Sequence, residues 1–437
     1  MKPHQVLLFI ACVMGCLAAL CFLLPGRIVI GSKEVRWPTM AKVLGTEEGE
    51  KIEEIDSLDA LDSLETLDSL DTIDSIVPEA PRIVVPKVVV DESADSRIFL
   101  QAFYASLAET GTRKVRVLHY GDSQIEEDRM TQQIREGLQK RYGGRGVGLM
   151  PLAQTIPTVT VRQELRMNGR MVTPQQGPRR YMVYAVSKDD QRTDSLYGIM
   201  GQVAIMADSL VKGSEDITAV CRPQTGSARY DRTRVFADTS IHYTISGDTV
   251  HLTGKGAVYG LSQESDTGVI VDNIPMRGCL GLVFTKMDSM QIADFCREEN
   301  VRLIILQFGG NAIPYNEKPG TIQGIVKSLR KQVLFVQSCA PEASILFIGP
   351  SDMMRMTDGE WESYPMVAYL DKLLRKMALE ENIAYFSLYN WMGGAGSMAR
   401  WQEIGLAGKD GIHFLRSGAR KAGNAVVEWM MEGEGER

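Results

Sequence analysis

Short apolar runs alternate with longer amphipathic stretches in two parts of this sequence. Short apolar runs are typical of strands buried on both faces of a parallel sheet, and apolar residues at helical spacing indicate helices packed on one side. This alternation predicts an α/β fold whose parallel sheet carries helices on both faces. The expected strands are Val115–His119, Val269–Ile274, Val301–Leu306, Ile345–Ile348 and Ile383–Ser387. The expected helices are Ser96–Glu109, Arg129–Tyr142, Ile322–Gln337, Met366–Glu380 and Leu415–Met431.

The pattern differs between residues 151 and 265, where alternating and β-branched segments replace the apolar runs. Thr158–Val161 is one such segment, and Thr249–Thr253 is another, directly after a turn-like Ser-Gly-Asp. These features predict an inserted, mainly β module, for which a sandwich is one candidate form. An insertion is tolerated when its two ends leave and return at one surface loop. The α/β domain would then comprise residues 96–150 and 266–437.

The N-terminal segment is apolar and uncharged from Val6 to Leu24. These 19 residues are just enough to cross a hydrocarbon core of about 30 Å. Secretory signal cores are shorter, about 7–15 residues, so an uncleaved signal anchor within residues 1–27 is the preferred interpretation, with residues 6–24 in the membrane. A lipoprotein cleavage box at Val13–Cys16 is disfavoured because the apolar run continues past the cysteine.

Residues 28–95 are interpreted as an acidic, low-complexity spacer. From Asp56 to Ile76, an acid, a small residue and Leu or Ile repeat every three positions. A period of three fits neither a helix, in which the apolar stripe would wind around the cylinder, nor a strand. The favoured interpretation is a solvated linker that holds the folded part away from the membrane. A docking segment for a partner is the alternative.

Charge and cysteine content narrow the classes of function. The 437 residues carry a net charge of −7, whereas nucleic-acid binding requires a concentrated basic face, so we expect no nucleic-acid partner. Three of the seven cysteines lie in the predicted anchor. The other four match no metal-ligand spacing and are expected to be scattered buried thiols, although their even number permits disulfides.

Only one of the five histidines is well placed for acid–base chemistry. The other four precede the apolar segment, lie inside a buried strand or fall in the module, where structural or surface roles are the default. These are His4, His119, His242 and His251. His413 lies before the last expected helix, three residues after Asp410. A carboxylate at this spacing can accept a hydrogen bond from one imidazole nitrogen and leave the other as a base, although a loop histidine near an aspartate is commonly just solvated.

A serine follows the first expected strand, in the run Gly121-Asp122-Ser123. Ligand crevices of open α/β sheets lie outside the carboxyl ends of the strands, and a glycine permits a sharp turn, so this serine is well placed for chemistry. Equally, Asp122 or Ser123 could be the N-cap of the following helix. The residues by themselves leave both interpretations open.

Two further loops could supply hydrogen-bond donors. Asn311, preceded by two glycines, follows one expected strand, and an asparagine amide can stabilise a developing oxyanion. Gly278 follows another expected strand, and its backbone N–H could join the same site. Each loop taken alone could equally be a simple turn.

Taken together, these features resemble the SGNH hydrolases, also called GDSL-like lipases and acylhydrolases. That family is marked, in chain order, by Gly-Asp-Ser after the first strand, a lone glycine, Gly-x-Asn and a terminal Asp-x-x-His. The resemblance covers about residues 115–142 and 269–427 and implies a three-layer α/β/α domain with a catalytic triad and an oxyanion hole. The triad would be Ser123, Asp410 and His413, and the oxyanion donors would be Ser123, Gly278 and Asn311.

Two positions depart from the family pattern. The residue after the serine is Gln124 instead of the usual Leu, and Ala312 stands where an Asp often follows the asparagine. The first change is tolerated in the wider family, and the second removes a supporting contact. Neither removes a catalytic group.

The resemblance implies a serine esterase that requires no cofactor and no metal. SGNH domains with an inserted β module and a membrane anchor resemble envelope enzymes that act on O-acetyl groups of peptidoglycan and other glycans. The expected activity is therefore removal of O-acetyl or other short acyl groups from such a polysaccharide, on the periplasmic side of the membrane. Tyr181, Tyr184 and Tyr230 of the module could stack on sugar rings or belong to its core.

Two other functions remain open at this point. The same triad would serve an O-acetyltransferase that receives its acyl group from a membrane acyltransferase partner. A non-catalytic, glycan-binding envelope protein is the third interpretation, although every acid, base and oxyanion position is occupied.

Overall fold

A computed structural model of the chain describes residues 27–30, 33–36, 93–152, 157–167, 170–171, 217–237, 241–254, 258–287, 289–314, 316–357 and 359–434. The chain divides into two units, residues 1–66 and 67–437. In the first unit, β1 (Arg27–Ile30) and β2 (Lys33–Arg36) pair as an antiparallel hairpin at the start of the predicted spacer. Within the described ranges, no helix is long and apolar enough to cross a membrane. The predicted anchor, residues 6–24, and the three-residue repeat lie outside these ranges.

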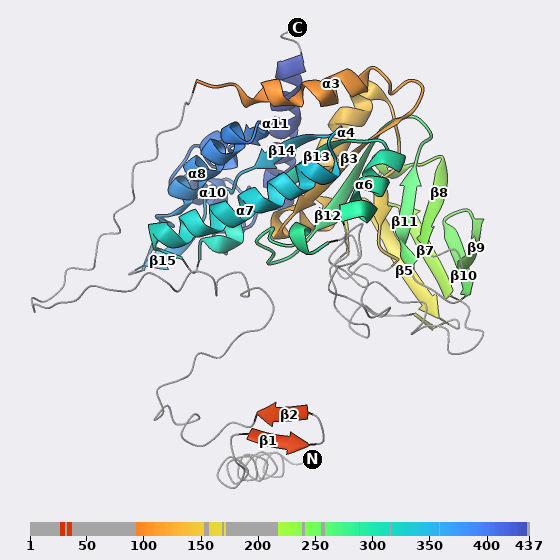
Figure 1. The fold of residues 1–437 in the computed structure, drawn as a ribbon, viewed down its shortest axis with the longest axis horizontal. Helices are drawn as coiled ribbons and strands as arrows, with labels where there is room; N and C mark the ends of the chain where they lie inside the picture. Colours follow the sequence, from red (N-terminus) through yellow and green to blue (C-terminus); the bar gives the residue numbers. More distant parts are fainter. Residues whose placement is uncertain are drawn as a thin grey trace, which may run out of the picture. The chain divides into compact units, whose positions relative to one another are not determined.

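Five parallel strands form the central sheet of the second unit, in the order β12-β3-β13-β14-β17 (Figure 1). Numbered within the sheet, this order is 2-1-3-4-5, whose topological switch point lies between β3 and β13. The predicted α/β fold with a parallel sheet is confirmed, and each strand coincides with an expected apolar run. The bounds are β3 (Lys114–Gly121), β12 (Gly268–Pro275), β13 (Val301–Gln307), β14 (Ser344–Ile348) and β17 (Ala384–Phe386).

Helices cover both faces of this sheet, as Figure 1 shows. Along β13, Leu303 and Ile305 belong to one hydrophobic cluster and Ile304 and Leu306 to the other, because successive side chains of a strand point to opposite faces. The first cluster includes residues of η1 (Ser96–Leu100), α3 (Gln101–Leu107), α4 (Thr131–Tyr142) and α11 (Arg416–Glu434). The second includes residues of α6 (Ser289–Glu298), α7 (Pro319–Cys339) and α8 (Val367–Glu380).

Between β3 and β12 the described residues form two antiparallel sheets, of strand orders β6-β5-β7-β10-β9 and β4-β11-β8. Side chains of both sheets, such as Val250 and Leu261, belong to the hydrophobic cluster that also contains α7 and α8. The first strand, β4, precedes the predicted start of the module and pairs with β11. The bounds are β4 (Gly148–Met150), β5 (Val161–Met167), β6 (Arg170–Met171), β7 (Ile217–Pro223), β8 (Arg232–Ala237), β9 (Ile241–Ser246), β10 (Thr249–Gly254) and β11 (Val258–Glu264).

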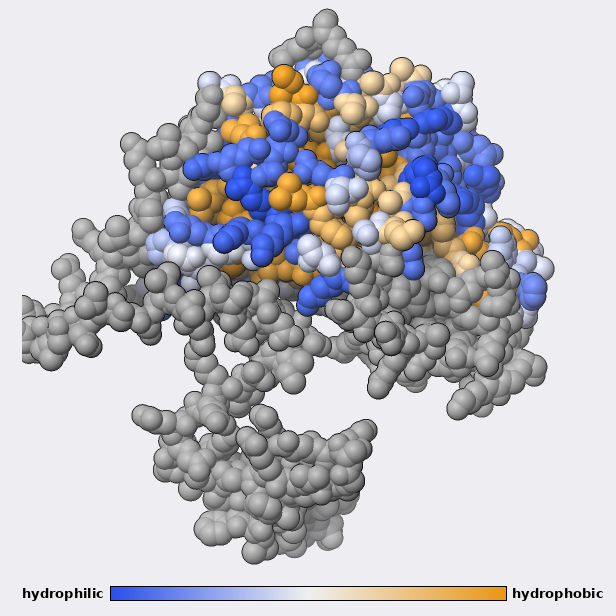
Figure 2. Space-filling model, viewed as in Figure 1, coloured by the Kyte–Doolittle hydropathy of each residue, from blue (hydrophilic) through white to orange (hydrophobic). Residues whose placement is uncertain are grey.

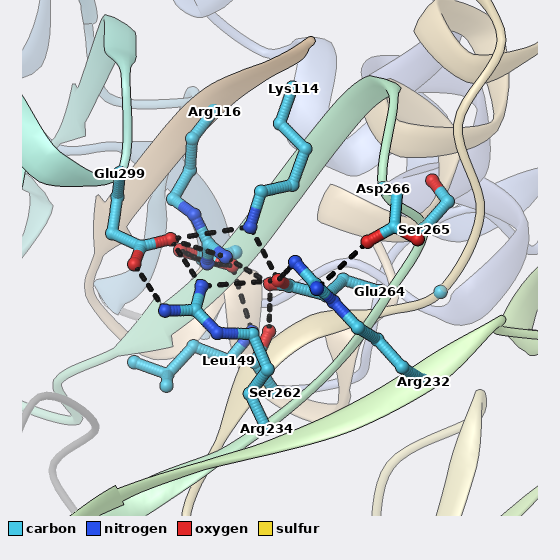
Figure 3. A network of polar contacts seen from close by, with 12 residues as sticks. Lys114, Arg116, Leu149, Arg232, Arg234, Ser262, Glu264, Ser265, Asp266 and Glu299 are labelled. Carbon is cyan, nitrogen blue, oxygen red and sulfur yellow. Dashed lines mark hydrogen bonds and ion pairs between the residues drawn. The ribbon is translucent and has the colours of Figure 1, made fainter.

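A buried ionic network joins the three-stranded sheet β4-β11-β8 to the central sheet (Figure 3). The guanidinium of Arg116, fully buried on β3, pairs with Glu264 of β11, with Asp272 of β12 at 3.0 Å and with Glu299 at 3.3 Å. Arg234 of β8 donates to both carboxylate oxygens of Glu299 at 2.8 Å. Charged groups are buried at low cost only when they are paired and hydrogen-bonded, as they are here. Ion pairs therefore connect the amino end of the central sheet to the module.

Several short elements were not expected from the sequence. The hairpin of β15 and β16 lies between β14 and α8, and its two strands are short and largely exposed. The predicted first helix divides into η1 and α3. The additional elements are β15 (Met354–Thr357), β16 (Glu360–Ser363), η4 (Gly226–Ala228), η5 (Phe284–Lys286), α9 (Leu388–Met392) and α10 (Ser397–Glu403).

Exposed apolar side chains are dispersed over the described surface. On the face in Figure 2, hydrophobic and hydrophilic residues are interspersed. The large exposed side chains come from many different elements, which is the normal state of a soluble surface. They are Ile98, Tyr243, Ile245, Met290, Leu334, Met356, Trp361, Ile404 and Leu415.

Candidate active site

The predicted nucleophile lies at the switch point of the central sheet. Ser123 begins η2 (Ser123–Asp128) immediately after β3. A Cβ on Gly121 would come within 3.2 Å of the Gln307 carbonyl oxygen on β13, so a glycine suits the close approach of these two strand ends. Asp122 is the N-cap, and its Oδ1 accepts the Gln124 N–H at 3.0 Å. Because the aspartate caps the turn, the Ser123 hydroxyl is left for another partner.

That partner is His413, which lies in the loop before α11. Ser123 Oγ is 2.7 Å from His413 Nε2, and His413 Nδ1 is 2.6 Å from Asp410 Oδ2. Gly411 adopts the left-handed conformation, with φ +70°, in the turn between the acid and the base. The structure thus brings the three predicted triad residues into one hydrogen-bonded chain, although they come from opposite ends of the α/β domain. This geometry is the one that lets an imidazole take a proton from a serine hydroxyl.

The environment of Asp410 favours its charged form. Partial burial opposes ionisation, but the bond from His413 and two backbone N–H groups outweigh it and hold the pKa of this carboxyl below its usual value. The backbone donors are Ile412 and His413, each 3.0 Å from Asp410 Oδ1. An ionised Asp410 keeps a proton on Nδ1 of the histidine and leaves Nε2 to act as the base.

The other two predicted oxyanion residues, Asn311 and Gly278, are not equally placed relative to the serine. Asn311, in η6 (Gly310–Ala312), lines the same cavity as Ser123. Its amide nitrogen donates to Asp122 Oδ2 at 3.1 Å and to the Cys279 carbonyl at 3.2 Å. Gly278 lies in the turn after β12, with φ +73°, and is not among the residues that line the cavity. Asn311 must therefore exchange one of its present bonds before it can hold an oxyanion.

Asp122 is a part of the site that the sequence indicated only as a cap. It is buried, and burial raises the pKa of its carboxyl to about 6. Its two oxygens accept from neutral groups, the Gln124 backbone N–H and the Asn311 amide. Ala312, which replaces the family's usual aspartate, is buried in the hydrophobic cluster. Asp122 is thus a buried carboxylate directly between the nucleophile and the predicted oxyanion donor.

Two side chains connect the serine turn to the histidine loop. Gln124 donates to the Ile412 carbonyl at 2.7 Å, and its Oε1 accepts the Phe414 N–H at 3.4 Å. Arg129 donates to the Ser123 carbonyl at 3.0 Å and to the Phe414 carbonyl at 2.9 Å. These bonds hold the backbone on both sides of the histidine. Gln124 was visible in the sequence only as a departure from Leu, and nothing in the sequence pattern indicated Arg129.

A small recess opens beside the serine, at the carboxyl ends of β3, β13 and β14. Its volume is about 30 Å³. Polar groups of the site and apolar residues both line it. The lining residues are Asp122, Ser123, Gln124, Gln307, Phe308, Gly310, Asn311, Gly349, Pro350, Ser351, Met353, Ile412 and His413.

His119 has the structural role expected for it. It is fully buried, its Nε2 is 3.1 Å from Gln307 Oε1, and its Nδ1 is 2.9 Å from Thr131 Oγ1. Burial lowers the pKa of His119 to about 3, so the ring is neutral. It supports the end of β13 without touching the reacting groups.

The remaining candidate residues have mixed outcomes. Cys221, Cys296 and Cys339 are buried as expected, whereas Cys279 is only partly buried. Tyr230 is half-buried and donates to Asp248 at 2.6 Å, while Tyr181 and Tyr184 lie outside the described residues. In the part of the chain that the structure describes, no group of three or more His, Cys, Asp or Glu side chains could hold a metal ion.

Comparisons with known proteins agree with this architecture. No protein-family model and no curated protein sequence matches the chain. A solved structure described as a peptidoglycan O-acetylesterase superposes with a TM-score of 0.58 and 20% identity, covering 79% of this chain and 98% of that one. Est24, a carbohydrate acetylesterase from Sinorhizobium meliloti, matches with a TM-score of 0.29 and 17% identity, over 38% of this chain and 79% of its own. A GDSL-like lipase from Parabacteroides merdae matches with a TM-score of 0.27 and 16% identity, over 40% and 74%.

The chain has the α/β/α fold of the solved peptidoglycan O-acetylesterase structure. The resemblance expected from the sequence motifs is therefore confirmed at the level of the fold. The extensive match with the peptidoglycan O-acetylesterase structure covers nearly all of that protein.

Proposed function

We propose that this protein is a serine esterase that removes O-acetyl or other short acyl groups from an envelope or extracellular polysaccharide such as peptidoglycan. The observation that carries the proposal is the hydrogen-bonded chain from Ser123 through His413 to Asp410 at the switch point of the sheet. The fold similarity to a peptidoglycan O-acetylesterase supports the choice of substrate class.

The proposed reaction uses these groups in sequence. Ser123 Oγ attacks the ester carbonyl carbon while its proton moves to His413 Nε2, and Asp410 stabilises the imidazolium. The resulting oxyanion would be held by the backbone N–H groups of Ser123 and Gly278 and by the amide of Asn311. The C–O bond to the sugar then breaks, and the sugar oxygen takes the proton from His413. Water repeats the sequence and releases the carboxylic acid and the free serine.

The apolar run Val6–Leu24 supports a place for this reaction at the membrane of the cell envelope, with the catalytic domain on the periplasmic side. It also favours a second candidate function. A glycan hydroxyl that reaches the acyl-enzyme before water would make the same site an O-acetyltransferase, whose acyl groups would come from a membrane acyltransferase partner.

The test is an esterase assay on the full chain purified in detergent, with 4-nitrophenyl acetate, acetylated peptidoglycan and acetylated xylan. Ser123→Ala and His413→Ala should each lower kcat/KM by at least about 10⁴-fold, as loss of a triad member typically does. His251→Ala and Ser417→Ala, which change the same residue types outside the site, should retain activity.

Each outcome decides between the candidates. Equal activity in wild type and Ser123→Ala would contradict the proposed nucleophile. Acyl transfer to an added glycan acceptor, without hydrolysis in water, would favour the transferase. Glycan binding by a folded protein that cleaves none of the three esters would leave the non-catalytic function.

A further inference from the structure

Part of the lining of the recess beside Ser123 is apolar. Phe308 and Met353, both almost fully buried, line it together with Gly310. A Cβ placed on Gly310 would lie 3.6 Å from the Met353 sulfur and 3.6 Å from Asp122 Oδ2. The thioether of Met353 therefore lies close to the turn that carries the predicted oxyanion donor, and both Met353 and Gly310 line the recess.

The volume of the recess limits what it can hold. A single water needs about 10–15 Å³ of such space. At about 30 Å³, the recess has room for two water-sized groups. The methyl of an acetyl group fits that room, whereas the longer chain of a butyryl group would have to displace the apolar wall.

We propose that this recess is the acyl pocket of the enzyme, and that Met353 and Gly310 set its depth and so restrict the substrate to acetyl and similarly short esters. The inference rests on the proposed esterase function and deepens it, because it names the residues that select the acyl group. Met353 is a specificity residue in this view. It meets the acyl chain and takes no part in proton transfer.

The backbone around Met353 is fixed independently of its side chain. The Met353 carbonyl accepts the Tyr364 N–H at 2.9 Å, and the Met354 N–H donates to the Gly411 carbonyl at 2.8 Å. The neighbouring Met354 packs in the hydrophobic cluster on the opposite side of the sheet. Shortening the Met353 side chain should therefore enlarge the recess without moving the strand end.

The widening test measures kcat/KM for 4-nitrophenyl acetate, propionate, butyrate and hexanoate with the full chain. In Met353→Ala, the butyrate-to-acetate ratio should rise at least about 10-fold, since each methylene accommodated in an apolar pocket changes discrimination by about 10–200-fold. Met377→Ala is the matched control. Met377 is a buried methionine of α8 in the same hydrophobic cluster, and it does not line the recess. Its variant should keep the wild-type ratio.

The narrowing test uses Gly310→Ala. Gly310 has a helical conformation without positive φ, and the added methyl would meet its neighbours at an ordinary contact distance. This variant should lower the propionate-to-acetate ratio at least about 3-fold, in the direction opposite to Met353→Ala, because the lost room is on the order of one methyl group. Because it adds an atom instead of leaving a cavity, it decides the question even if Met353→Ala fails to fold.

The failures are distinguishable. If the variants are active and keep the wild-type ratios of kcat/KM between esters of different acyl length, the assignment of the recess is wrong. The proposed esterase function would still stand. A wild type that already prefers hexanoate would also overturn the assignment of the recess. Absence of cleavage of every ester, in wild type and variants alike, would overturn the proposed function and this inference with it.

Discussion

Charged side chains are buried at both ends of β3, but their bonding partners differ. At the amino end, Arg116 is surrounded by three carboxylates on three other segments, and each is within ion-pair distance of a cation (Figure 3). At the carboxyl end, Asp122 is equally buried, but its hydrogen-bond donors are an amide and a backbone N–H. The carboxylates at the amino end of β3 are therefore neutralised by bonded cations. The carboxylate at the carboxyl end has no guanidinium or ammonium group bonded to it.

The pKa values follow this difference. Burial alone raises the pKa of any carboxyl group. At Glu264 that effect is outweighed by Arg116 and Lys114, and the pKa falls to about 2. At Asp122 burial prevails, and the pKa rises to about 6. At the structural end of the sheet, bonded cations outweigh the effect of burial on the carboxyl pKa. At the end with the candidate active site, no bonded cation offsets it, and such perturbed pKa values are typical of functional sites.

The largest effect is expected from breaking the paired end. Arg116→Met should lower the free energy of unfolding by about 3–5 kcal/mol, because it leaves buried carboxylates without their main cation. Activity per folded molecule should persist, since the network lies at the end of the sheet away from Ser123. Urea unfolding followed by fluorescence measures the change.

Arg232→Met provides the control for this prediction. Arg232 contacts Glu264 at 3.4 Å and Asp266 at 2.9 Å, but its side chain is 45% exposed. Its loss should cost less than about 1 kcal/mol. If both variants lowered the free energy of unfolding equally, burial of the ionic network would not explain the loss of stability.

At the unpaired end, Asn311→Ala should lower kcat for acetyl ester hydrolysis by about 10²–10³-fold with little change in KM, because one oxyanion donor is lost. Asn316→Ala is the comparison, since Asn316 lies in the same loop and donates to the Ala312 carbonyl at 2.7 Å. An unchanged kcat in Asn311→Ala would show that its amide stays with Asp122 throughout the reaction.

A smaller effect is expected from Gln124→Leu, which installs the residue common in SGNH hydrolases. Loss of the bonds to Ile412 and Phe414 should loosen the histidine loop and lower kcat about 10-fold, while KM stays constant. Gln132→Leu on α4 removes a side-chain hydrogen bond to Glu136 and should leave kcat unchanged. Steady-state kinetics separates kcat from KM, and a parallel rise in KM would argue against a positioning role.

The last prediction concerns a difference in pH dependence. Asp122 has a folded pKa of about 6 against an ordinary 3.8, so its contribution to stability is complete below about pH 4 and is lost as the pH rises to 6. Glu264 has a folded pKa of about 2 against 4.5, so its contribution is complete above about pH 4.5 and is lost as the pH falls to 2.

Thermal unfolding between pH 2 and 8 measures both contributions. Asp122→Asn should remove the loss of stability between pH 4 and 6. The loss of stability as the pH falls below 4.5 should persist in Asp122→Asn and be smaller in Glu264→Gln. Identical pH profiles for Asp122→Asn and wild type would contradict the unpaired state of Asp122.

The central sheet was predictable from sequence because its strands are buried on both faces. β13 is an almost unbroken apolar run, and such a run has few other interpretations when long amphipathic stretches flank it. The β15–β16 hairpin was missed because it is short and mostly exposed, so burial leaves no pattern in its residues. The split of the first predicted helix into η1 and α3 was also invisible, because both parts place apolar residues toward the same cluster.

The residues of the hydrogen-bonded chain Ser123–His413–Asp410 could be selected from the sequence because few histidines were available and each motif lay at a strand end or in a late loop. Their supporting contacts could not be, since Arg129 bonds a carbonyl 285 residues away and no local pattern encodes that distance. The same holds for Arg116, whose isolated charge inside an apolar strand gave no indication of partners on β11 and β12. Long-range pairing of polar groups is set by the tertiary fold and leaves no periodic signal in the chain.

The position of the inserted module has a consequence for how the protein folds. β3 and β12 are neighbours in register, with Val115 opposite Val269, yet residues 122–267 separate them along the chain. Closing so long a loop costs entropy before any ladder bond forms, and high contact order slows folding. The edge strand β12, next to the strand that precedes the serine turn, should therefore join the sheet late, after the module has collapsed.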